Sequence, residues 1–495
     1  MTRRRILVAL VAAILVAASV TMLERARAGL EITALQAGET PATLYRLPGV
    51  EGPLVVVAHG FAGSRQLMQA YSLTLAKAGY AVLAFDFEGH GRNPEPMSGD
   101  VTSVDGTTAR LVAETREVLT LGRARVGETG GVALLGHSMA TDVIVRAALA
   151  EAEAGHPVDA VVTISMFSQA VTASAPQRLL AISGEWEGRL RDAALAAARL
   201  VQLDAAEGET VQAGDVLRRA VVAPGVEHVG VLYSATAVRE AQLWLDAAFG
   251  REGAVAPVRV GPWILALLGG IVALTYPLVG LLPKARVRPA EIPARRFWAA
   301  VLLPAALVPL VATTIYIPFL PVLVADYLML HLVLLGGLQL VLLRVWRLGG
   351  PPLSAGAALA LALWGIGVFG LAMDRYAASF VPNAERLVVI AALAFGTVPF
   401  MIADSYATGA GRGRWWRRIA ARLALFLSLA AAAAIDPERL LFLVIILPVL
   451  LLFFVVHGLM GRWVGARCGP LAAGLGLGLC LAWALGVSFP LFSAG

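Results

Sequence analysis

The stretch Gly130-Gly131-Val132-Ala133-Leu134-Leu135-Gly136-His137-Ser138-Met139-Ala140 decides the fold of the first half of this chain. A short apolar run, typical of a buried strand, ends in a serine and continues directly into helix-forming sequence. Gly136 and Ala140 stand two residues before and after Ser138, where small residues are needed because a sharp turn brings strand and helix close together. The pattern indicates a serine on a tight strand-to-helix turn, which is either a nucleophile or a buried side chain in an ordinary connection.

The composition places a large part of the chain in a membrane. Of its 495 residues 58% are hydrophobic, and the mean hydropathy of +0.75 is too high for an ordinary soluble protein. Residues 30–250 hold 16 Lys and Arg against 25 Asp and Glu, whereas long apolar segments with arginine-bearing loops follow residue 261. The net charge of +6 therefore combines an acidic soluble half with a basic membrane half. It gives no reason to expect a nucleic-acid partner.

The N-terminal segment has the pattern of an export signal. Three arginines, Arg3 to Arg5, precede an apolar run from Ile6 to Leu23. The run is long enough for an uncleaved signal anchor, which we favour, although Ala26-Arg27-Ala28 could serve as a cleavage site. Both interpretations export the residues that follow.

Residues 30–250 show strand-like and helix-like runs in alternation. This alternation predicts an α/β domain in which a mostly parallel sheet carries helices on both faces. The valine-rich runs are those of strands buried on both sides. The predicted strands are 54–58, 80–85, 132–135, 158–165, 178–183 and 220–223, and helices are predicted near 65–78 and 107–123.

Several motifs in this region, in this order along the chain, resemble those of the α/β-hydrolases. His59-Gly60 resembles that family's oxyanion loop, and Asp86 to Asn93 resembles its D-x-x-G-H-G-x-S turn with Asn93 in place of the serine. Gly136 to Ala140 is similar to its nucleophile elbow, with alanine in place of the last glycine. Pro176 to Glu187 resembles the strand and turn that carry the acid, and His228 follows the last strand as the family's histidine does.

The resemblance implies a Ser, acid and His in the chain order that the fold requires. Ser138 would be the nucleophile and His228 the base that takes its proton, because a serine hydroxyl is a weak nucleophile at neutral pH. Glu187 is our choice for the carboxylate that orients His228. The family usually has Asp there, and Glu185 and Asp192 are close in sequence, so both remain alternatives.

The same resemblance implies an oxyanion hole formed by the backbone N–H groups of Phe61, or a close neighbour, and of Met139. Only about a dozen residues separate the strand ending near Ser165 from the one starting at Arg178, which leaves no room for a helical lid. The seven histidines show no metal-ligand spacing, so we expect neither a metal nor another cofactor.

The second half of the chain predicts eight membrane-spanning helices, each near the length needed to cross a bilayer. With the N-terminus in the cytoplasm, the N-terminal tail and the predicted inner loops hold 16 Lys and Arg. The outer connections 317–321, 374–386 and 436–439 and the tail after 491 hold 3. The positive-inside rule favours this orientation, which puts the soluble domain outside the cytoplasmic membrane. The predicted spans are 262–282, 297–316, 322–343, 354–373, 387–405, 419–435, 440–460 and 470–491.

The sequence thus predicts a membrane-anchored serine hydrolase that cleaves an ester or related acyl bond, lipid-linked esters among them. The expected parts are residues 1–29 as signal anchor or signal peptide, 30–250 as hydrolase domain, 251–261 as linker and 262–495 as membrane domain. Two other functions remain open. One is acyl transfer through the same acyl-enzyme, and the other is a transport or assembly protein whose hydrolase-like domain only binds a ligand.

Overall fold

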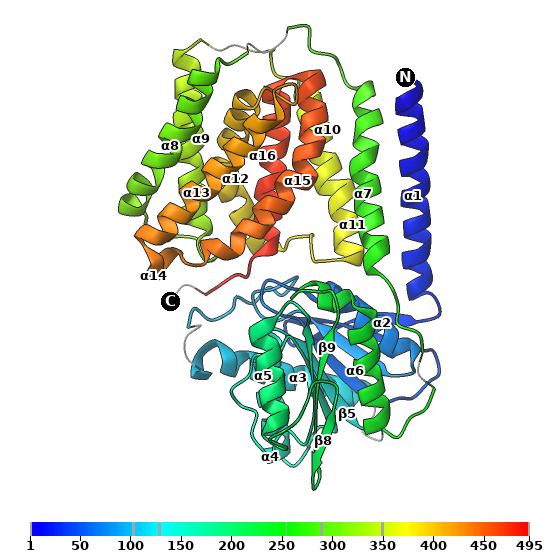
Figure 1. Ribbon diagram of the computed structural model, residues 1–495. Helices are drawn as coiled ribbons and strands as arrows, with labels where there is room; N and C mark the ends of the chain where they lie inside the picture. Colours follow the sequence, from blue (N-terminus) through cyan, green and yellow to red (C-terminus); the bar gives the residue numbers. More distant parts are fainter. Residues whose placement is uncertain are drawn as a thin grey trace. The chain divides into compact units, whose positions relative to one another are not determined.

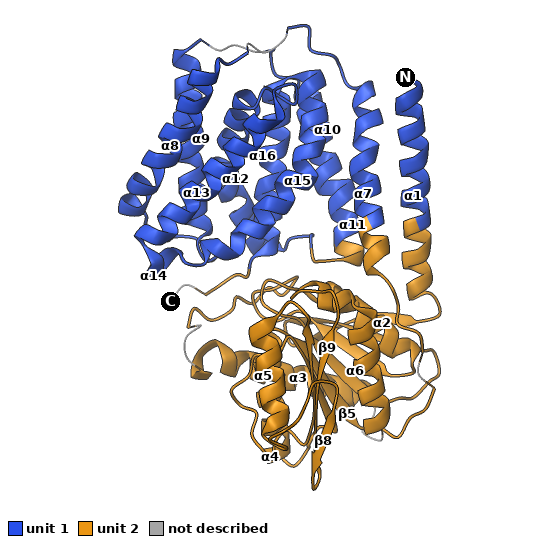
Figure 2. Ribbon diagram, viewed as in Figure 1, with its two compact units in different colours: residues 1–18, 266–373, 380–489 blue, residues 19–265, 374–379, 490–495 orange. Residues whose placement is uncertain are grey.

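The computed structural model describes residues 2–100, 104–126, 130–253, 255–287, 291–347 and 351–493. Residue 254 of the expected linker, and parts of two arginine-bearing loops, lie outside these ranges. The chain forms two compact units, coloured separately in Figure 2. The sheet unit comprises Ser19–Leu265, Asp374–Ser379 and Pro490–Gly495, and the helical unit comprises Met1–Ala18, Ala266–Met373 and Phe380–Phe489.

The sheet unit is built on a nine-stranded sheet with the order β1-β2-β4-β3-β5-β6-β7-β9-β8. The six strands from β4 to β9 are parallel, while β1, β2 and β8 pair antiparallel at the two edges. The predicted α/β class with a mostly parallel sheet is therefore confirmed. The strands are β1 Glu31–Ala37, β2 Thr40–Arg46, β3 Leu54–Ala58, β4 Ala81–Phe85, β5 Val132–His137, β6 Ala160–Ile164, β7 Arg178–Gly184, β8 Thr210–Ala213 and β9 Val216–Ala223.

Burial explains why the sequence predicts the parallel strands and not the edge strands. Every residue of β3, β4, β5 and β6 is buried, as expected for strands with helices on both faces. Such strands read as unbroken apolar runs. The edge strands β1 and β8 have one buried residue each and alternate apolar with polar side chains, so they have no such run.

Helices cover both faces of the sheet, as predicted. In Figure 1, α3, α4 and α5 lie on one side of the strands and α2 and α6 on the other, and α3 packs on α4 while α2 packs on α6. Their bounds are α2 Gln69–Lys77, α3 Ala109–Val126, α4 Met139–Glu153, α5 Gly188–Arg199 and α6 Ala235–Ala248, with short helical turns η1 Arg65–Met68, η2 Val104–Thr108 and η3 Gly230–Tyr233.

The order of the strands brings two loops together. β3 lies between β4 and β5 in the sheet, so the chain leaves β3 toward one side and later returns to its other side as β5. The carboxyl ends of parallel strands on either side of such a switch point form a crevice in open α/β sheets. The loops after β3 and β5 meet at this point, and they carry Gly60 and Ser138.

The helical unit contains the predicted spans. Within the described ranges, nine helices are long and apolar enough to cross a membrane, with α1 Arg3–Arg27 as the first. Each of the eight predicted segments coincides with one of the others. These are α7 and η4 Gly261–Leu281, α8 Ala294–Ile315, α9 Ala325–Val345, α10 to α11 Ala355–Tyr376, α12 Ala384–Ala407, α13 Trp415–Ile435, α15 Leu443–Cys468 and α16 Pro470–Ser488, while α14 Pro437–Leu440 is a single turn.

Glycines allow α12 to pack closely against α9 and α16. A Cβ at Gly336 of α9 would lie 2.4 Å from the Cα of Phe400, and one at Gly478 of α16 would lie 2.5 Å from the Cα of Val398. Apolar side chains gain little from leaving lipid, so helices in a membrane associate through such close backbone contacts. The small residues therefore fix the centre of this bundle.

A buried carboxyl group ties α3 to the loop after β4. Glu114 accepts hydrogen bonds from the hydroxyl of Thr40 at 2.6 Å, from the Glu88 N–H at 3.0 Å and from the amide of Asn93 at 2.8 Å. Burial is the larger effect, and it raises the pKa of Glu114 from 4.5 to about 8 in spite of these donors. Glu114 is therefore protonated in the folded protein over a range in which an unfolded glutamate is ionised.

We expect the stability of the sheet unit to fall between about pH 5 and pH 8 because of Glu114. In this window unfolding releases the proton of Glu114, so a rise in pH favours the unfolded state. The stabilising effect is complete below pH 4.5 and is lost as the pH approaches 8. Thermal unfolding of Glu114→Gln should show a melting temperature that rises relative to wild type over this range. Glu117→Gln, which changes an exposed residue of the same helix, is the control. Melting temperatures of wild type and Glu114→Gln that change equally with pH would refute the assignment.

Candidate active site

The turn between β5 and α4 presents Ser138. Its backbone has φ +54° and ψ −119°, a conformation that residues other than glycine rarely adopt. A Cβ at Gly136 would lie 3.0 Å from Ile144 and 3.1 Å from the carbonyl oxygen of Ala140, so this position leaves little space for a side chain. Ala140 itself is fully buried, and its methyl group is thus accommodated where the usual pattern has glycine. The turn holds the backbone of Ser138 in a strained conformation.

The three residues predicted to act together lie in one hydrogen-bonded chain. The Nε2 atom of His228 is 2.9 Å from the Oγ of Ser138, and its Nδ1 is 2.5 Å from a carboxylate oxygen of Glu187. Ser138 follows β5, Glu187 follows β7 and His228 follows β9, so three strand ends supply the chain. This geometry lets His228 take the proton of Ser138 at Nε2 while Nδ1–H stays bonded to the carboxylate.

Glu187 is held by its second oxygen. That atom accepts the Gly184 N–H at 2.6 Å and the hydroxyl of Ser165 at 2.9 Å. Burial alone would raise the pKa of Glu187, but the hydrogen bonds from His228, Gly184 and Ser165 outweigh it and keep the pKa below its ordinary value. The carboxylate is therefore ionised at neutral pH. Ser165 was not predicted from the sequence, since its only local signal is its place directly after a buried strand.

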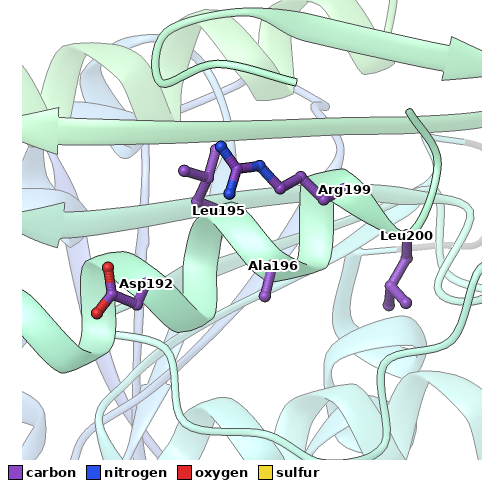
Figure 3. A pocket seen from close by; sticks show the side chains of 5 residues that line it. All are labelled: Asp192, Leu195, Ala196, Arg199 and Leu200. Atoms are coloured by element: carbon purple, nitrogen blue, oxygen red, sulfur yellow. The ribbon is translucent and has the colours of Figure 1, made fainter. Parts of the chain in front are cut away.

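The two alternative acids lie elsewhere. Glu185 accepts the backbone N–H of Gly225 at 2.7 Å. Asp192 lines a hollow of about 400 Å³ on α5, shown in Figure 3 with the four other lining residues of that helix and its end. Neither makes the contact with His228 that Glu187 makes.

His137 restrains the backbone of His228. Its Nε2–H donates to the carbonyl oxygen of His228 at 2.9 Å, and the two rings lie 4.8 Å apart. Burial lowers the pKa of His137 to about 4, so this ring is neutral at physiological pH. A neutral ring can keep a proton on Nε2 for this bond without adding a second positive charge beside His228.

The two predicted oxyanion donors belong to the segments on either side of Ser138. Met139 is the first residue of α4, where backbone N–H groups lack partners within the helix and the helix dipole favours negative charge. Phe61 lies in the turn after β3, whose Gly60 is close to Ser138: a Cβ at Gly60 would lie 2.9 Å from the Cβ of Ser138. Both donors thus belong to segments that adjoin the Ser138 hydroxyl.

Hydrogen bonds connect the loops after β3 and β4 next to the turn that carries Phe61. His59 contacts the carbonyl oxygen of Gly60 at 2.8 Å through Nδ1 and accepts the N–H of Phe87 at 3.1 Å through Nε2. Asp86 accepts the N–H of Arg65 at 2.8 Å and forms an ion pair with its guanidinium. These contacts fix the base of the turn that carries Phe61.

Three large apolar side chains on the segments that carry Ser138, Glu187 and His228, or bonded to them, are exposed to solvent. Phe167, Trp186 and Val229 are 62%, 68% and 50% exposed. Trp186 precedes Glu187, Val229 follows His228, and the N–H of Phe167 donates to the hydroxyl of Thr141, three residues after Ser138. Residues 165–177 contain no helix. Across the described part of the chain, no three His, Cys, Asp or Glu side chains gather as metal ligands would.

Comparison with known proteins relates this region to one family. Residues 52–203 match the family model described as serine aminopeptidase, S33. The predicted resemblance to the α/β-hydrolases is confirmed over this part of the chain, and the apolar helices that follow fit a membrane domain. No curated protein matches the chain.

Solved structures resemble a part of the chain. A Thermus thermophilus protein is 20% identical, with 45% of this chain and 99% of that chain covered and a TM-score of 0.31. Dienelactone hydrolase from Anabaena variabilis is 19% identical, with 44% and 97% covered and a TM-score of 0.30. A hormone-sensitive lipase from a metagenome library is 14% identical, with 47% and 92% covered and a TM-score of 0.34.

We expect Glu187→Gln to slow the reaction of Ser138 with a fluorophosphonate by about 10³-fold or more, because the amide favours the wrong tautomer of His228. The rate of labelling of purified full-length protein measures this effect. Asp192→Asn is the matched control and should label at the wild-type rate. Full reactivity of Glu187→Gln together with loss in Asp192→Asn would move the acid to Asp192.

Proposed function

We propose that this protein is a membrane-anchored serine hydrolase that cleaves an ester or related acyl bond through an acyl-enzyme. The observation that carries the proposal is the hydrogen-bonded chain from Ser138 through His228 to Glu187, at 2.9 and 2.5 Å. A match to a hydrolase family model over residues 52–203 supports it. A domain that only binds a ligand has no need of a nucleophile, base and orienting acid in this order.

In the first step, the Oγ of Ser138 attacks the carbonyl carbon while its proton passes to Nε2 of His228. The negative oxygen of the tetrahedral intermediate is held by the N–H groups of Met139 and Phe61, and the loss of one such donor typically costs about 3 kcal/mol in the barrier. His228 then gives its proton to the leaving alcohol as the carbon–oxygen bond breaks. Water, activated by the same imidazole, attacks the acyl-enzyme, releases the acid and restores Ser138.

The exposed apolar side chains support a substrate with an apolar acyl group. Phe167, Trp186 and Val229 can cover such a group where it leaves Ser138, and burial of apolar surface stabilises the complex by roughly 25 cal/mol per Å². The nine helices of the described residues that are long and apolar enough to cross a membrane would keep the enzyme at one, where lipid-linked esters are concentrated. We therefore propose membrane-partitioned esters as the substrate class.

The distribution of charge supports an active site outside the cytoplasmic membrane. The N-terminal tail and the loops expected inside hold 16 Lys and Arg, whereas the outer connections between the apolar helices hold 3. A bias of this kind sets the orientation of membrane proteins. An amide bond is the second candidate, because the matched family model is described as an aminopeptidase. Acyl transfer to an alcohol would use the same acyl-enzyme.

A membrane-impermeant fluorophosphonate applied to intact cells tests nucleophile and orientation together. We expect the full-length protein to be labelled and Ser138→Ala to lose all labelling. Ser168→Ala, which changes a nearby serine outside the chain of hydrogen bonds to His228, is the control and should label as wild type. Labelling only after the cells are opened would show that the active site faces the cytoplasm. Labelling of Ser138→Ala at full strength would exclude Ser138 as the nucleophile.

The substrate class is tested by acyl-chain length. We expect Trp186→Ala to lower kcat/KM for a long-chain ester about tenfold, a loss of about 1.4 kcal/mol of apolar contact, and to leave a short-chain ester nearly unchanged. Leu203→Ala removes an even more exposed side chain that follows α5 and should change neither rate. Equal effects of Trp186→Ala on both esters, or a wild-type preference for short soluble esters, would contradict the lipid assignment. Faster cleavage of aminoacyl anilides than of any ester would favour the amide bond.

A further inference from the structure

The segment Asp374–Ser379, here called the connector, links α11 to α12 but belongs to the sheet unit (Figure 2). α11 Phe369–Tyr376 ends within it, and α12 begins at Ala384. The connector is thus a piece of the helical half of the sequence that completes the unit holding Ser138. Its contacts are made with the loops after β3 and β4, with the first residue of α2 and with the last part of α1.

Several contacts hold the connector. Asp374 forms an ion pair with Arg92, and the carbonyl oxygen of Arg375 accepts the side-chain amide of Gln69 at 3.0 Å. The guanidinium of Arg375 binds the carboxylate of Glu24 at 2.6 and 2.8 Å. The last contact is a backbone one, in which the N–H of Ser379 donates to the Oγ of Ser64 at 3.0 Å.

The contact with Ser379 uses the hydroxyl of Ser64, which would normally cap the short helix that follows it. Ser64 is the N-cap residue of η1, with extended φ −162° and ψ 165°, yet its hydroxyl makes no capping bond. Serine at this position usually accepts an N–H from the first turn of its helix. Here the hydroxyl accepts from a residue 315 positions further along the chain, and both serines are buried, at 1% and 8% exposure.

Ser64 adjoins the turn that carries Phe61. This turn runs from Gly60 to Gly63, with a bond from the Gly63 N–H to the Gly60 carbonyl oxygen at 3.0 Å and a positive φ of +55° at Ala62. Glycines give such a turn more backbone freedom than other residues would. The direction of the Phe61 N–H therefore depends on how the two ends of the turn are fixed, at His59 and at Ser64.

A second late segment supports the neighbouring loop. Residues 490–493 pair with the loop after β4 through the Leu491 N–H to Gly89 at 2.9 Å, the Met97 N–H to Leu491 at 2.8 Å and the Ser493 N–H to Met97 at 2.8 Å. A Cβ at Gly89 would lie 2.5 Å from the carbonyl oxygen of Leu491. The ring of His90 in this loop contacts the ring of Phe61 edge-on at 5.7 Å.

We propose that the connector is a positioning element of the oxyanion turn. The Ser379 N–H, held in place by the Asp374 and Arg375 contacts, fixes Ser64 and with it the direction of the Phe61 N–H. The inference rests on the proposed function, since it assigns the purpose of this turn to stabilising a tetrahedral intermediate. The connector lies between α11 and α12 in the chain, outside residues 30–250. Full turnover therefore requires this part of the helical half and not residues 30–250 alone.

The test compares Ser379→Pro with Ser379→Ala in the full-length protein. Proline removes the backbone N–H, whereas alanine keeps it and loses only a side chain that makes no contact in this argument. A misplaced donor acts on the transition state more than on substrate binding, and a displacement of about 1 Å can cost about 100-fold. We expect Ser379→Pro to lower kcat for a soluble ester about 10-fold to 100-fold with KM within about twofold, and Ser379→Ala to match wild type.

A second pair removes the acceptor. Ser64→Ala should lose kcat as Ser379→Pro does, and Ser64→Thr, which keeps a hydroxyl, should restore it. Hydrogen exchange of residues 60–64 gives a readout that needs no turnover, and it should be faster in Ser379→Pro than in Ser379→Ala. Wild-type kcat in Ser379→Pro, unchanged exchange, or a change in KM alone would each overturn the inference. An unlabelled Ser138 in the wild type would instead overturn the proposed function, so the two failures are distinct.

Discussion

The backbone conformation of Ser138 is the constraint on which the site depends. A positive φ at a residue with a side chain costs on the order of 1–3 kcal/mol, so the surrounding structure has to enforce it. The enforcement comes from both sides of the turn. The Ser138 N–H is held by the carbonyl oxygen of Ile164 at 2.8 Å, and Gly60 and Gly136 leave the space that the sharp turn requires. Larger residues at these two glycines would push apart the segments that meet at Ser138.

Parallel strands explain how distant residues reach this point. The chain runs in the same direction through β3, β5, β6, β7 and β9, so the residues that follow each strand come out at one edge of the sheet. Phe61, Ser138, Ser165, Glu187 and His228 are each within a few residues of such an end. The site is thus a consequence of strand direction, and each loop needs to supply only one group.

This regularity also decides how far the sequence could predict the protein. Fully buried strands are continuous apolar runs, so their ends could be located, and the candidate residues next to them with them. The second strand of the sheet, β2, mixes buried and half-buried residues within Thr-Pro-Ala-Thr-Leu-Tyr-Arg, which has no such run. Ser165 and Ser64 act through single hydroxyl groups whose partners are 22 and 315 residues away. A pattern within one sequence contains no information about contacts of this range.

The contacts of the last residues affect how the site is completed during synthesis. The parallel core strands and α4 are all made before residue 250, and their contacts can form as soon as that part of the chain is free. The partners of Ser64 and Gly89 are residues 379 and 491, which are made more than 300 residues later. Closing so long a loop adds only a slowly growing entropic cost, because that cost rises with the logarithm of loop length. The late contacts therefore add little free-energy cost but form late in synthesis. The turn from Gly60 to Gly63 gains the Ser379 contact only after the helices up to α11 have been made, and Gly89 gains its contact with Leu491 only after α16.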